Sequence, residues 1–330
     1  MNIFLTKLLY KVINLKHYQR NRSLLKKVDA LRNNQKTIQY NNHPRVTAIV
    51  QFFNKRHNIP GIIQRLHASE FEEIIVIDDG SLDGSYEDWV THLTRPNDFL
   101  LRCNDIFEVR TYDRAIRMAR GEYVCLLQDD DLPPASNDWV TNALLLFDSL
   151  PNLLILGGNA GIDLMMPDPI PPNGSQAYHA INGICGCPGI NKHRSYRKPL
   201  YNENKTNLPF MFTTAVNRAP VFIKRQPLID LGGIDQAYAP FQFDDDDLCV
   251  RAWLAGYQVG LYSCSFVRDV GRGGMRIYNK ERIDKQVMIN ANKFYQTYSD
   301  IIENGELQQL IDEANQSLTS NLSLLEKVKN

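Results

Sequence analysis

The stretch Glu73-Ile74-Ile75-Val76-Ile77-Asp78-Asp79-Gly80-Ser81 decides the fold class of this chain. Its four central residues are apolar and β-branched without a break, which is typical of a strand buried on both faces of a parallel sheet. The aspartates, glycine and serine that follow end the strand in a tight turn. The stretch therefore predicts a sheet that is covered by helices on both sides.

Strand and helix patterns alternate along the chain on either side of this stretch. Strands are predicted at residues 46–52, 99–102 and 123–127, and helices at 59–67 and 109–120. This alternation predicts an α/β fold, built on a mostly parallel sheet with helices on both faces. In such sheets ligands bind beyond the carboxyl ends of the strands.

Three regions are expected along the chain. Residues 1–44 form a basic amphipathic helical arm, with its helix at 3–31, and a polar linker. Residues 45–279 form the folded α/β domain, in which the Gly-, Pro- and Asn-rich segment 157–220 is expected to consist of long loops with one or two strands. Residues 280–330 return to a helical pattern and form a C-terminal helical arm.

The composition is that of an ordinary globular protein, with 43% hydrophobic and 22% charged residues. Basic and acidic side chains balance, but residues 1–36 carry nine Lys or Arg and one acid. A basic amphipathic helix suits either an anionic membrane surface or a face of the protein's own body, and both alternatives stay open.

No apolar run reaches about 18 residues, so no spanning helix is expected. The six cysteines are expected to be reduced in a cytoplasmic compartment, and no nucleic-acid partner is expected.

The run Asp129-Asp130-Asp131 follows directly after the predicted strand 123–127. A charge run is usually a solvated loop, but here the backbone delivers the carboxylates to the ligand-binding edge of the sheet. Carboxylates so close repel one another unless a cation neutralises them. Oxygen ligands suit Mg²⁺ or Mn²⁺, and substrate phosphates often complete the coordination shell. The run therefore predicts a site for a metal ion and a diphosphate.

A second run, Asp244-Asp245-Asp246-Asp247, comes before a helical pattern that is expected to end at Gly256. One aspartate is expected to cap the N-terminus of this helix. Asp244 and Asp245 are expected to precede the helix and to face the cleft, where a carboxylate would act as a general base.

The pair Asp78-Asp79 at the end of the first-quoted strand allows two interpretations. It forms a plain turn, or it hydrogen-bonds a nucleobase or ribose. A calcium loop of the EF-hand type is excluded, because the twelfth position counted from Asp79 is Val90, where a bidentate glutamate is needed.

These residues also carry a likeness to a known family. From about Arg45 to Tyr262 the chain resembles the inverting glycosyltransferases of family 2, which have the GT-A fold. The likeness is carried by five stretches that occur in order, at residues 46–54, 73–81, 119–124 with 129–131, 231–235 and 244–257. Each stretch alone is a weak signal, and their order and spacing identify the family.

The resemblance implies a nucleoside-diphosphate-sugar donor, usually with uridine, that is bound through Mn²⁺ or Mg²⁺. The sugar would go to a glycan or another hydroxyl acceptor. Residues 45–135 would form the donor-binding half, and residues 136–279 the acceptor half. The donor-binding residues that the resemblance implies are Phe52, Asn54, Asp78, Asp79, Arg110, Asp129 and Asp130.

The metal ligands follow from the same resemblance. The second acid of the family's Asp-x-Asp motif falls on Asp130. Its first acid falls on Gln128, a departure that leaves two alternatives open: Asp129 or Asp131 compensates, or the metal binds more loosely. The family's later histidine is missing, and Asp269 is the candidate third ligand in its place.

The family's Glu-Asp pair falls on Asp244 and Asp245, which makes Asp245 the candidate catalytic base. This base would take the proton of an acceptor hydroxyl, which attacks the anomeric carbon from the face opposite the leaving diphosphate, with inversion. Arg268 or Arg272 would stabilise the charge that develops on the diphosphate.

Three other functions stay open on the residues alone. A nucleotidyltransferase would use a similar sheet and metal, but the loop at 51–57 lacks the glycine expected of a triphosphate-binding loop. A catalytically degenerate nucleotide-sugar-binding protein is compatible with Gln128 and the missing histidine, although the retained acids argue against it. A glycoside hydrolase would also use two carboxylates, but it needs no aspartate run at a strand end.

Overall fold

The computed structural model describes single residues between Lys11 and Lys26 and then residues 43–158, 161–164, 194–197, 210–218, 220–262, 264 and 280–320. The chain divides into two compact units, Met1–Tyr40 and Asn41–Asn330. The described residues of the first unit are helical, as the sequence predicts. Within the described ranges, no helix is both long and apolar enough to cross a membrane. Membrane contact by the first unit stays a prediction.

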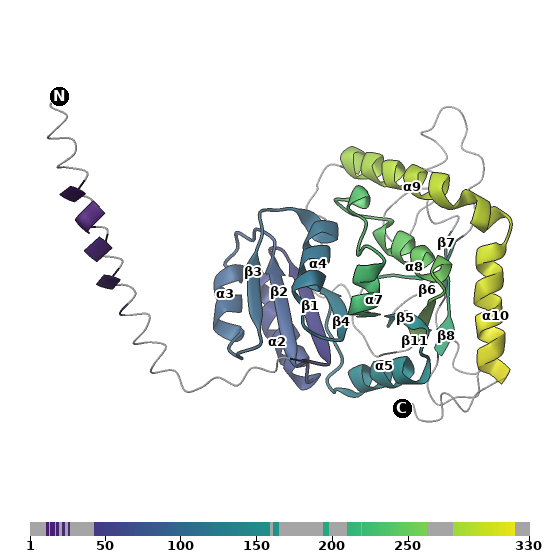
Figure 1. Ribbon diagram of the computed structural model, residues 1–330, viewed down its shortest axis with the longest axis horizontal. Helices are drawn as coiled ribbons and strands as arrows, with labels where there is room; N and C mark the ends of the chain where they lie inside the picture. Colours follow the sequence, from purple (N-terminus) through teal and green to yellow (C-terminus); the bar gives the residue numbers. More distant parts are fainter. Residues whose placement is uncertain are drawn as a thin grey trace. The chain divides into compact units, whose positions relative to one another are not determined.

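A mixed sheet of eight strands forms the core of the second unit, in the order β3-β2-β1-β4-β10-β5-β11-β8 (Figure 1). The strands are β1 (Val46–Phe52), β2 (Glu73–Asp78), β3 (Phe99–Arg102), β4 (Tyr123–Gln128), β5 (Leu153–Gly157), β8 (Phe210–Phe212), β10 (Val221–Lys224) and β11 (Gln258–Tyr262). The first four run parallel, and β11 runs parallel to β5. Strand β10 is antiparallel to both of its neighbours, and β8 is antiparallel to β11. The predicted α/β class is confirmed.

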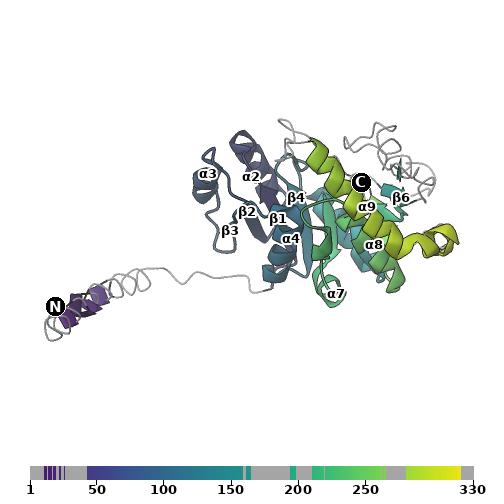
Figure 2. The same cartoon turned by 90° about the horizontal axis from the view of Figure 1, so that it is seen from above.

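Helices of the first half lie on opposite faces of the sheet. Helices α2 (Ile59–Ala68) and α3 (Ser85–His92) follow β1 and β2, where the chain steps outward to β3. Helix α4 (Phe107–Met118) follows β3, where the chain returns across the sheet to β4. Connections between parallel strands of one sheet are right-handed. When the chain reverses the direction in which it adds strands to the sheet, the connecting helix therefore lies on the other face. Figure 2 shows α2 and α4 on opposite sides of the strands.

Later elements are distributed around the second half of the sheet. They are the helices α5 (Asp138–Ser149), α7 (Arg225–Asp230), α8 (Asp244–Leu254), α9 (Lys280–Glu303) and α10 (Glu306–Ser320), and the 3-10 turn η3 (Gln236–Tyr238); a further 3-10 turn, η1 (Arg56–Asn58), follows β1. A second, smaller sheet has the order β7-β6-β9 and is formed by β6 (Gly161–Leu164), β7 (Arg194–Arg197) and β9 (Ala215–Val216). The segment 157–220, expected to be long loops with one or two strands, holds the short strands β6, β7, β8 and β9 in its described part.

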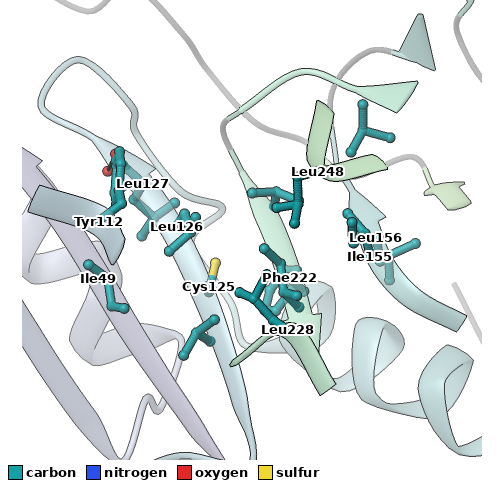
Figure 3. Packing of buried hydrophobic residues seen from close by; sticks show 14 of the residues in the cluster. Ile49, Tyr112, Cys125, Leu126, Leu127, Ile155, Leu156, Phe222, Leu228 and Leu248 are labelled. Carbon is teal, nitrogen blue, oxygen red and sulfur yellow. Dashed lines mark hydrogen bonds between the residues drawn. The ribbon is translucent and has the colours of Figure 1, made fainter. Parts of the chain in front are cut away.

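The hydrophobic core is continuous across the middle of the large sheet (Figure 3). Phe222 of β10 pairs with Cys125 of β4 on one side and with Leu156 of β5 on the other. Leu228 of α7 and Leu248 of α8 belong to the same buried cluster. Full burial of one such side chain contributes about 1.5–3 kcal/mol. The ends of these strands are therefore positioned by a well-packed hydrophobic core.

Helix α8 begins earlier than the sequence predicts. Its first residue is Asp244, so all four aspartates lie in its first turn, and the N-cap is Phe243, at φ +67°. The expectations that Asp244 and Asp245 precede the helix and that an aspartate caps it are therefore wrong. Four negative side chains in the first turn are favourable because the helix dipole is positive there. The predicted stop is confirmed, since the helix ends at Leu254 and Gly256 has φ +81°.

The C-terminal helices α9 and α10 pack on the folded domain (Figure 1). Asn315 of α10 accepts a hydrogen bond from the backbone N–H of Phe212 at 2.9 Å and donates one to its carbonyl at 3.1 Å. These two bonds satisfy backbone groups on the outer edge of β8. Without such partners, the edge strand would be open to pairing with other chains.

Candidate active site

The carboxyl ends of three neighbouring parallel strands gather the first group of candidate residues. In the register of the sheet, Phe52 at the end of β1 pairs with Asp78 at the end of β2. On the other side, Gln51 of β1 pairs with Gln128 at the end of β4. The loops that follow these strands therefore open at one edge of the sheet, as expected for a ligand-binding edge.

Lys55 lies between two aspartates of the first acidic run. Its ammonium is 2.7 Å from Oδ1 of Asp129 and 3.2 Å from Oδ2 of Asp130. Oδ2 of Asp129 also accepts the backbone N–H of Phe53 at 2.9 Å. Burial raises the pKa of Asp129 to about 6, although Lys55 opposes the shift. Burial alone would lower the pKa of Lys55, but Asp129 and Asp130 more than offset this and raise it.

The third aspartate of the run turns inward. Asp131 is 1% exposed, and its Oδ2 accepts the backbone N–H of Gln128 at 2.7 Å. The Gln128 amide in turn donates to Oε2 of Glu108 on α4 at 3.1 Å. The glutamine that replaces the first acid of the motif is therefore hydrogen-bonded to α4, the helix that connects β3 with β4.

Asp78 and Asp79 are both fully buried. The two carboxylate oxygens of Asp79 accept the backbone N–H groups of Ile106 and Phe107, at 3.0 and 2.8 Å. This carboxylate therefore fixes the start of α4. Asp78 lies 3.7 Å from Nε of Arg102, and burial raises its pKa against that opposing charge.

The remaining predicted donor residues have different surroundings. Asn54, at φ +53°, receives the N–H of Leu82 on its side-chain oxygen at 2.7 Å and joins the loops after β1 and β2. Phe52 is buried in the core against Trp89, so only its backbone reaches the strand ends. Arg110 is exposed on α4. The structure thus gathers the predicted aspartates and Asn54 at one edge and leaves the side chains of Phe52 and Arg110 outside that group.

A buried arginine organises the second acidic run. Arg218, which is 5% exposed, donates to Asp244 through Nη2 and to Oδ1 of Asp245 through Nε at 2.9 Å. Its backbone N–H reaches Oδ2 of Asp245 at 3.2 Å. Sequence reasoning missed Arg218, because it lies in a stretch without periodicity. Four consecutive aspartates indicate that some buried cation lies opposite them, but they do not indicate which residue provides it.

The two carboxylates on Arg218 differ in their access to solvent. The side chain of Asp244 is 3% exposed, and that of Asp245 is 26% exposed. Burial raises the pKa of Asp244 to about 7; Arg218 opposes this rise and Asp245 adds to it. The same three residues line a small pocket whose floor is apolar and includes Leu126 and Ile155. Asp245 is therefore the more accessible of the two carboxylates.

Tyr112 of α4 lies between the two acidic runs. Its hydroxyl donates to the backbone carbonyl of Leu127 in β4, two residues before Asp129. The guanidinium of Arg218 stacks over its ring at 4.8 Å from the centroid. Figure 3 shows Tyr112 beside Leu127 at the end of β4. Tyr112 therefore connects the end of β4 with Arg218, and sequence reasoning missed it because a buried tyrosine looks like any core residue.

Helix α9 braces the segment that leads into α8. The amide nitrogen of Asn290, which is fully buried, lies 2.7–3.1 Å from the carbonyl oxygens of Tyr238, Phe241 and Gln242. The helical pattern predicted α9, but no feature of the sequence linked Asn290 to the aspartates of α8.

The fit of a divalent cation depends on Asp130. Among the described residues, no group of three or more His, Cys, Asp or Glu side chains is arranged to hold a metal ion. Lys55 contacts Oδ2 of Asp130, which leaves Oδ1 for a metal. Ions such as Mg²⁺ are commonly held by one or two carboxylates and by substrate phosphates, so a site completed by the donor fits these residues. Asp269, Arg268 and Arg272 lie outside the described residues.

Comparison with known proteins places the chain in a family. The model of the family described as Glycosyl transferase family 2 matches residues 47–220. The uncharacterized protein y4gI of Sinorhizobium fredii is 25% identical over 211 residues, which are 61% of this chain and 21% of that protein. The chain thus spans about a fifth of the length of the curated relative it matches.

Two solved structures are similar. The mannosyltransferase PcManGT from Pyrobaculum calidifontis, in complex with GDP-Man and Mn²⁺, aligns with a TM-score of 0.50 and 17% identity over 94% of this chain and 86% of that chain. Residues 1–349 of S. aureus TarS, in complex with UDP-GlcNAc, align with a TM-score of 0.49 and 16% identity over 76% of this chain and 66% of that chain. The first of these alignments supports a shared fold. Because the family model covers more than half of its length, the chain belongs to glycosyl transferase family 2.

Proposed function

We propose that this protein is a glycosyltransferase that moves a sugar from a nucleoside-diphosphate donor, most simply a uridine-diphosphate sugar, to a hydroxyl group of a glycan or similar acceptor. The observation that carries the proposal is the position of Asp245. It is the more solvent-accessible carboxylate of a buried ion cluster, and Tyr112 and Arg218 link it to the end of β4, next to the aspartates at the strand ends. A base close to the donor site suits a direct displacement, because the acceptor hydroxyl must contact both the base and the donor sugar.

The donor half comprises residues 45–135. Asp79, which matches the family's base-contacting aspartate, would take the nucleoside at the ends of β1 and β2, together with Asn54 and with Asp78, which has Arg102 beside it. Asp130 would hold a divalent Mn²⁺ or Mg²⁺ ion, which supplies positive charge to the diphosphate as it leaves. Asp79 and Asp129 position the surrounding backbone through their hydrogen bonds to Phe107 and Phe53. Asp131 and Asp269 stay predictions as further ligands.

The acceptor half comprises residues 136–279 and contributes the base. The Asp245 carboxylate takes the proton of the acceptor hydroxyl as that oxygen forms a bond to the anomeric carbon of the donor sugar. The bond from that carbon to the diphosphate breaks on the opposite face, and the diphosphate leaves with the electron pair. Configuration is inverted. Arg218 keeps Asp245 oriented through two hydrogen bonds, one from its side chain and one from its backbone.

A panel of nucleotide-sugars tests this proposal. Thermal unfolding is measured with UDP-, GDP- and other nucleoside-diphosphate sugars, with and without Mn²⁺, and donor hydrolysis is assayed for each ligand that stabilises the protein. We expect one donor to raise the melting temperature in the presence of Mn²⁺ and to be hydrolysed, and we expect Asp130→Ala to lose both effects. If no nucleotide or nucleotide-sugar stabilises the wild-type protein under any condition, the proposed donor site is wrong.

A further inference from the structure

A cation belonging to the chain itself occupies the acidic pair at the end of β4. The Lys55 side chain is only 8% exposed, and its ammonium contacts both Asp129 and Asp130. A divalent ion on Asp130 would lie close to this ammonium, since both would be bound to the same carboxylate. Two positive charges so close, in a partly buried site, repel each other strongly.

We propose that Lys55 excludes a free divalent cation from Asp130, so that the metal and the donor bind only together. This inference rests on the proposed function, because it assigns the metal and the diphosphate to this edge of the sheet. The donor brings at least two negative charges on its diphosphate. These charges offset the repulsion between the metal and the ammonium, and they give the ammonium a new anionic partner.

The contacts of the two aspartates show which ion pair would give way. Asp129 is fixed by three contacts, since Lys55 and the N–H of Phe53 bind its carboxylate and the Asn58 amide donates to its carbonyl at 2.9 Å. Asp130 is held by Lys55 at the longer distance of 3.2 Å. The ammonium can therefore release Asp130 and keep Asp129. Lys55 acts as a positioning residue that couples two ligands.

Coupling of this kind is reciprocal. If the donor diphosphate raises the affinity for the metal, the metal must raise the affinity for the diphosphate by the same factor. The inference therefore predicts that the free protein binds Mn²⁺ weakly and that UDP or GDP increases this affinity. It also predicts that the increase depends on the charge of Lys55.

The test measures Mn²⁺ binding by electron paramagnetic resonance, which counts free Mn²⁺ and needs no turnover. Titrations compare wild-type protein, Lys55→Met, Lys55→Arg and Arg56→Met in the absence of nucleotide. We expect Lys55→Met to bind Mn²⁺ about tenfold more tightly or better, and Lys55→Arg to resemble wild type. Arg56→Met removes the same charge from the next residue, whose side chain pairs with Asp88, and should change nothing.

Lys55→Met leaves the carboxylate of Asp129 buried without its cation, and this variant could misfold for that reason alone. A second variant is therefore needed to keep the test decisive. The double variant Lys55→Met/Asp129→Asn removes the ion pair as a unit and leaves Asp130 intact, and it should also bind Mn²⁺ more tightly than wild type. Equal Mn²⁺ affinity in wild type and the double variant, or no measurable binding by either, would overturn the inference.

Titrations repeated with UDP or GDP separate the two proposals. We expect the nucleotide to tighten Mn²⁺ binding about tenfold in wild type and in Lys55→Arg, and much less in Lys55→Met and in the double variant. Tighter Mn²⁺ binding by Lys55→Met and the double variant, together with no effect of any nucleotide on any protein, would refute the donor site and retain the exclusion of free metal by Lys55.

Discussion

The hydroxyl of Tyr298 donates a hydrogen bond of 2.8 Å to Oδ1 of Asp247 in the buried interface between α9 and α8. The other oxygen of this carboxylate accepts Nε of Arg251 at 2.8 Å. Asp247 is the last of the four consecutive aspartates, three positions after Asp244. Helix α9 thus holds the helix that carries the candidate base.

Tyr298→Phe should lower the free energy of unfolding by about 1–3 kcal/mol, because it removes one donor from a buried carboxylate. Chemical unfolding in urea measures the change. Tyr257→Phe is the matched control, since Tyr257 is a half-buried tyrosine that lies outside the contact with α9. Equal losses in the two variants would mean that the bond to Asp247 contributes nothing specific.

Asn290→Leu should lower kcat by about tenfold or more, because small displacements of a catalytic group are costly. The variant removes the amide that holds the carbonyls at 238, 241 and 242, directly before Asp244. Steady-state kinetics should show an unchanged KM for the donor. Gln286→Ala removes a neighbouring bond to Asn290 and leaves the carbonyl contacts in place, so its effect should be smaller. A loss of stability with kcat intact would reduce Asn290 to a packing role.

Asp245→Asn should lower kcat by a factor of about 10²–10⁴, the range typical of general-base catalysis. Binding of the donor should survive, because Asp245 lies beyond Tyr112 from the strand ends. Calorimetry with donor and Mn²⁺ measures the binding, and turnover assays measure kcat. Asp235→Asn, on the surface and paired with Lys293, is the control. Near-normal turnover by Asp245→Asn would remove this residue from the base role.

Asp244 should make stability depend on pH. Its pKa is about 7 in the folded protein against an ordinary value of 3.8, so folding favours the protonated form. The stabilisation is complete below about pH 4 and is lost as the pH rises through about 7. Relative to Asp244→Asn, wild type should therefore lose about 2–4 kcal/mol between these limits. Thermal unfolding of both proteins from pH 4 to 8 measures the difference, and parallel curves would contradict the assignment.

The sequence predicts the strands well because their patterns are local. The observed bounds of β1 and β3 are those predicted, β4 is longer than predicted by one residue at its end, and β2 is longer by one residue at each end. Continuous apolar runs ended by Asp, Gly or Gln leave little freedom in where a buried strand stops. The same patterns placed the aspartates of β2 and β4 at one edge of the sheet.

The partners of those aspartates could not be predicted, because they depend on contacts distant in the chain. Lys55 reads as a solvated loop residue until β1 and β4 are paired and their loops meet. Arg218 stands 26 residues before Asp244 in a segment without periodicity. The start of α8 differs from the prediction because an aspartate was expected as the N-cap, whereas Phe243 takes that position and Arg218 and Arg251 pair with aspartates of the first turn.

The insertion of β10 between β4 and β5 has a consequence for how the protein is made. Strands β1 to β4 are contributed by one continuous stretch of chain and can assemble on the ribosome as they emerge. Strand β10 pairs with β4 from far downstream, so the second half of the sheet closes only after much more of the chain has been translated. Helix α8 is secured later still, when α9 arrives with Tyr298. We expect a nascent chain to complete its donor half well before its candidate base is in place.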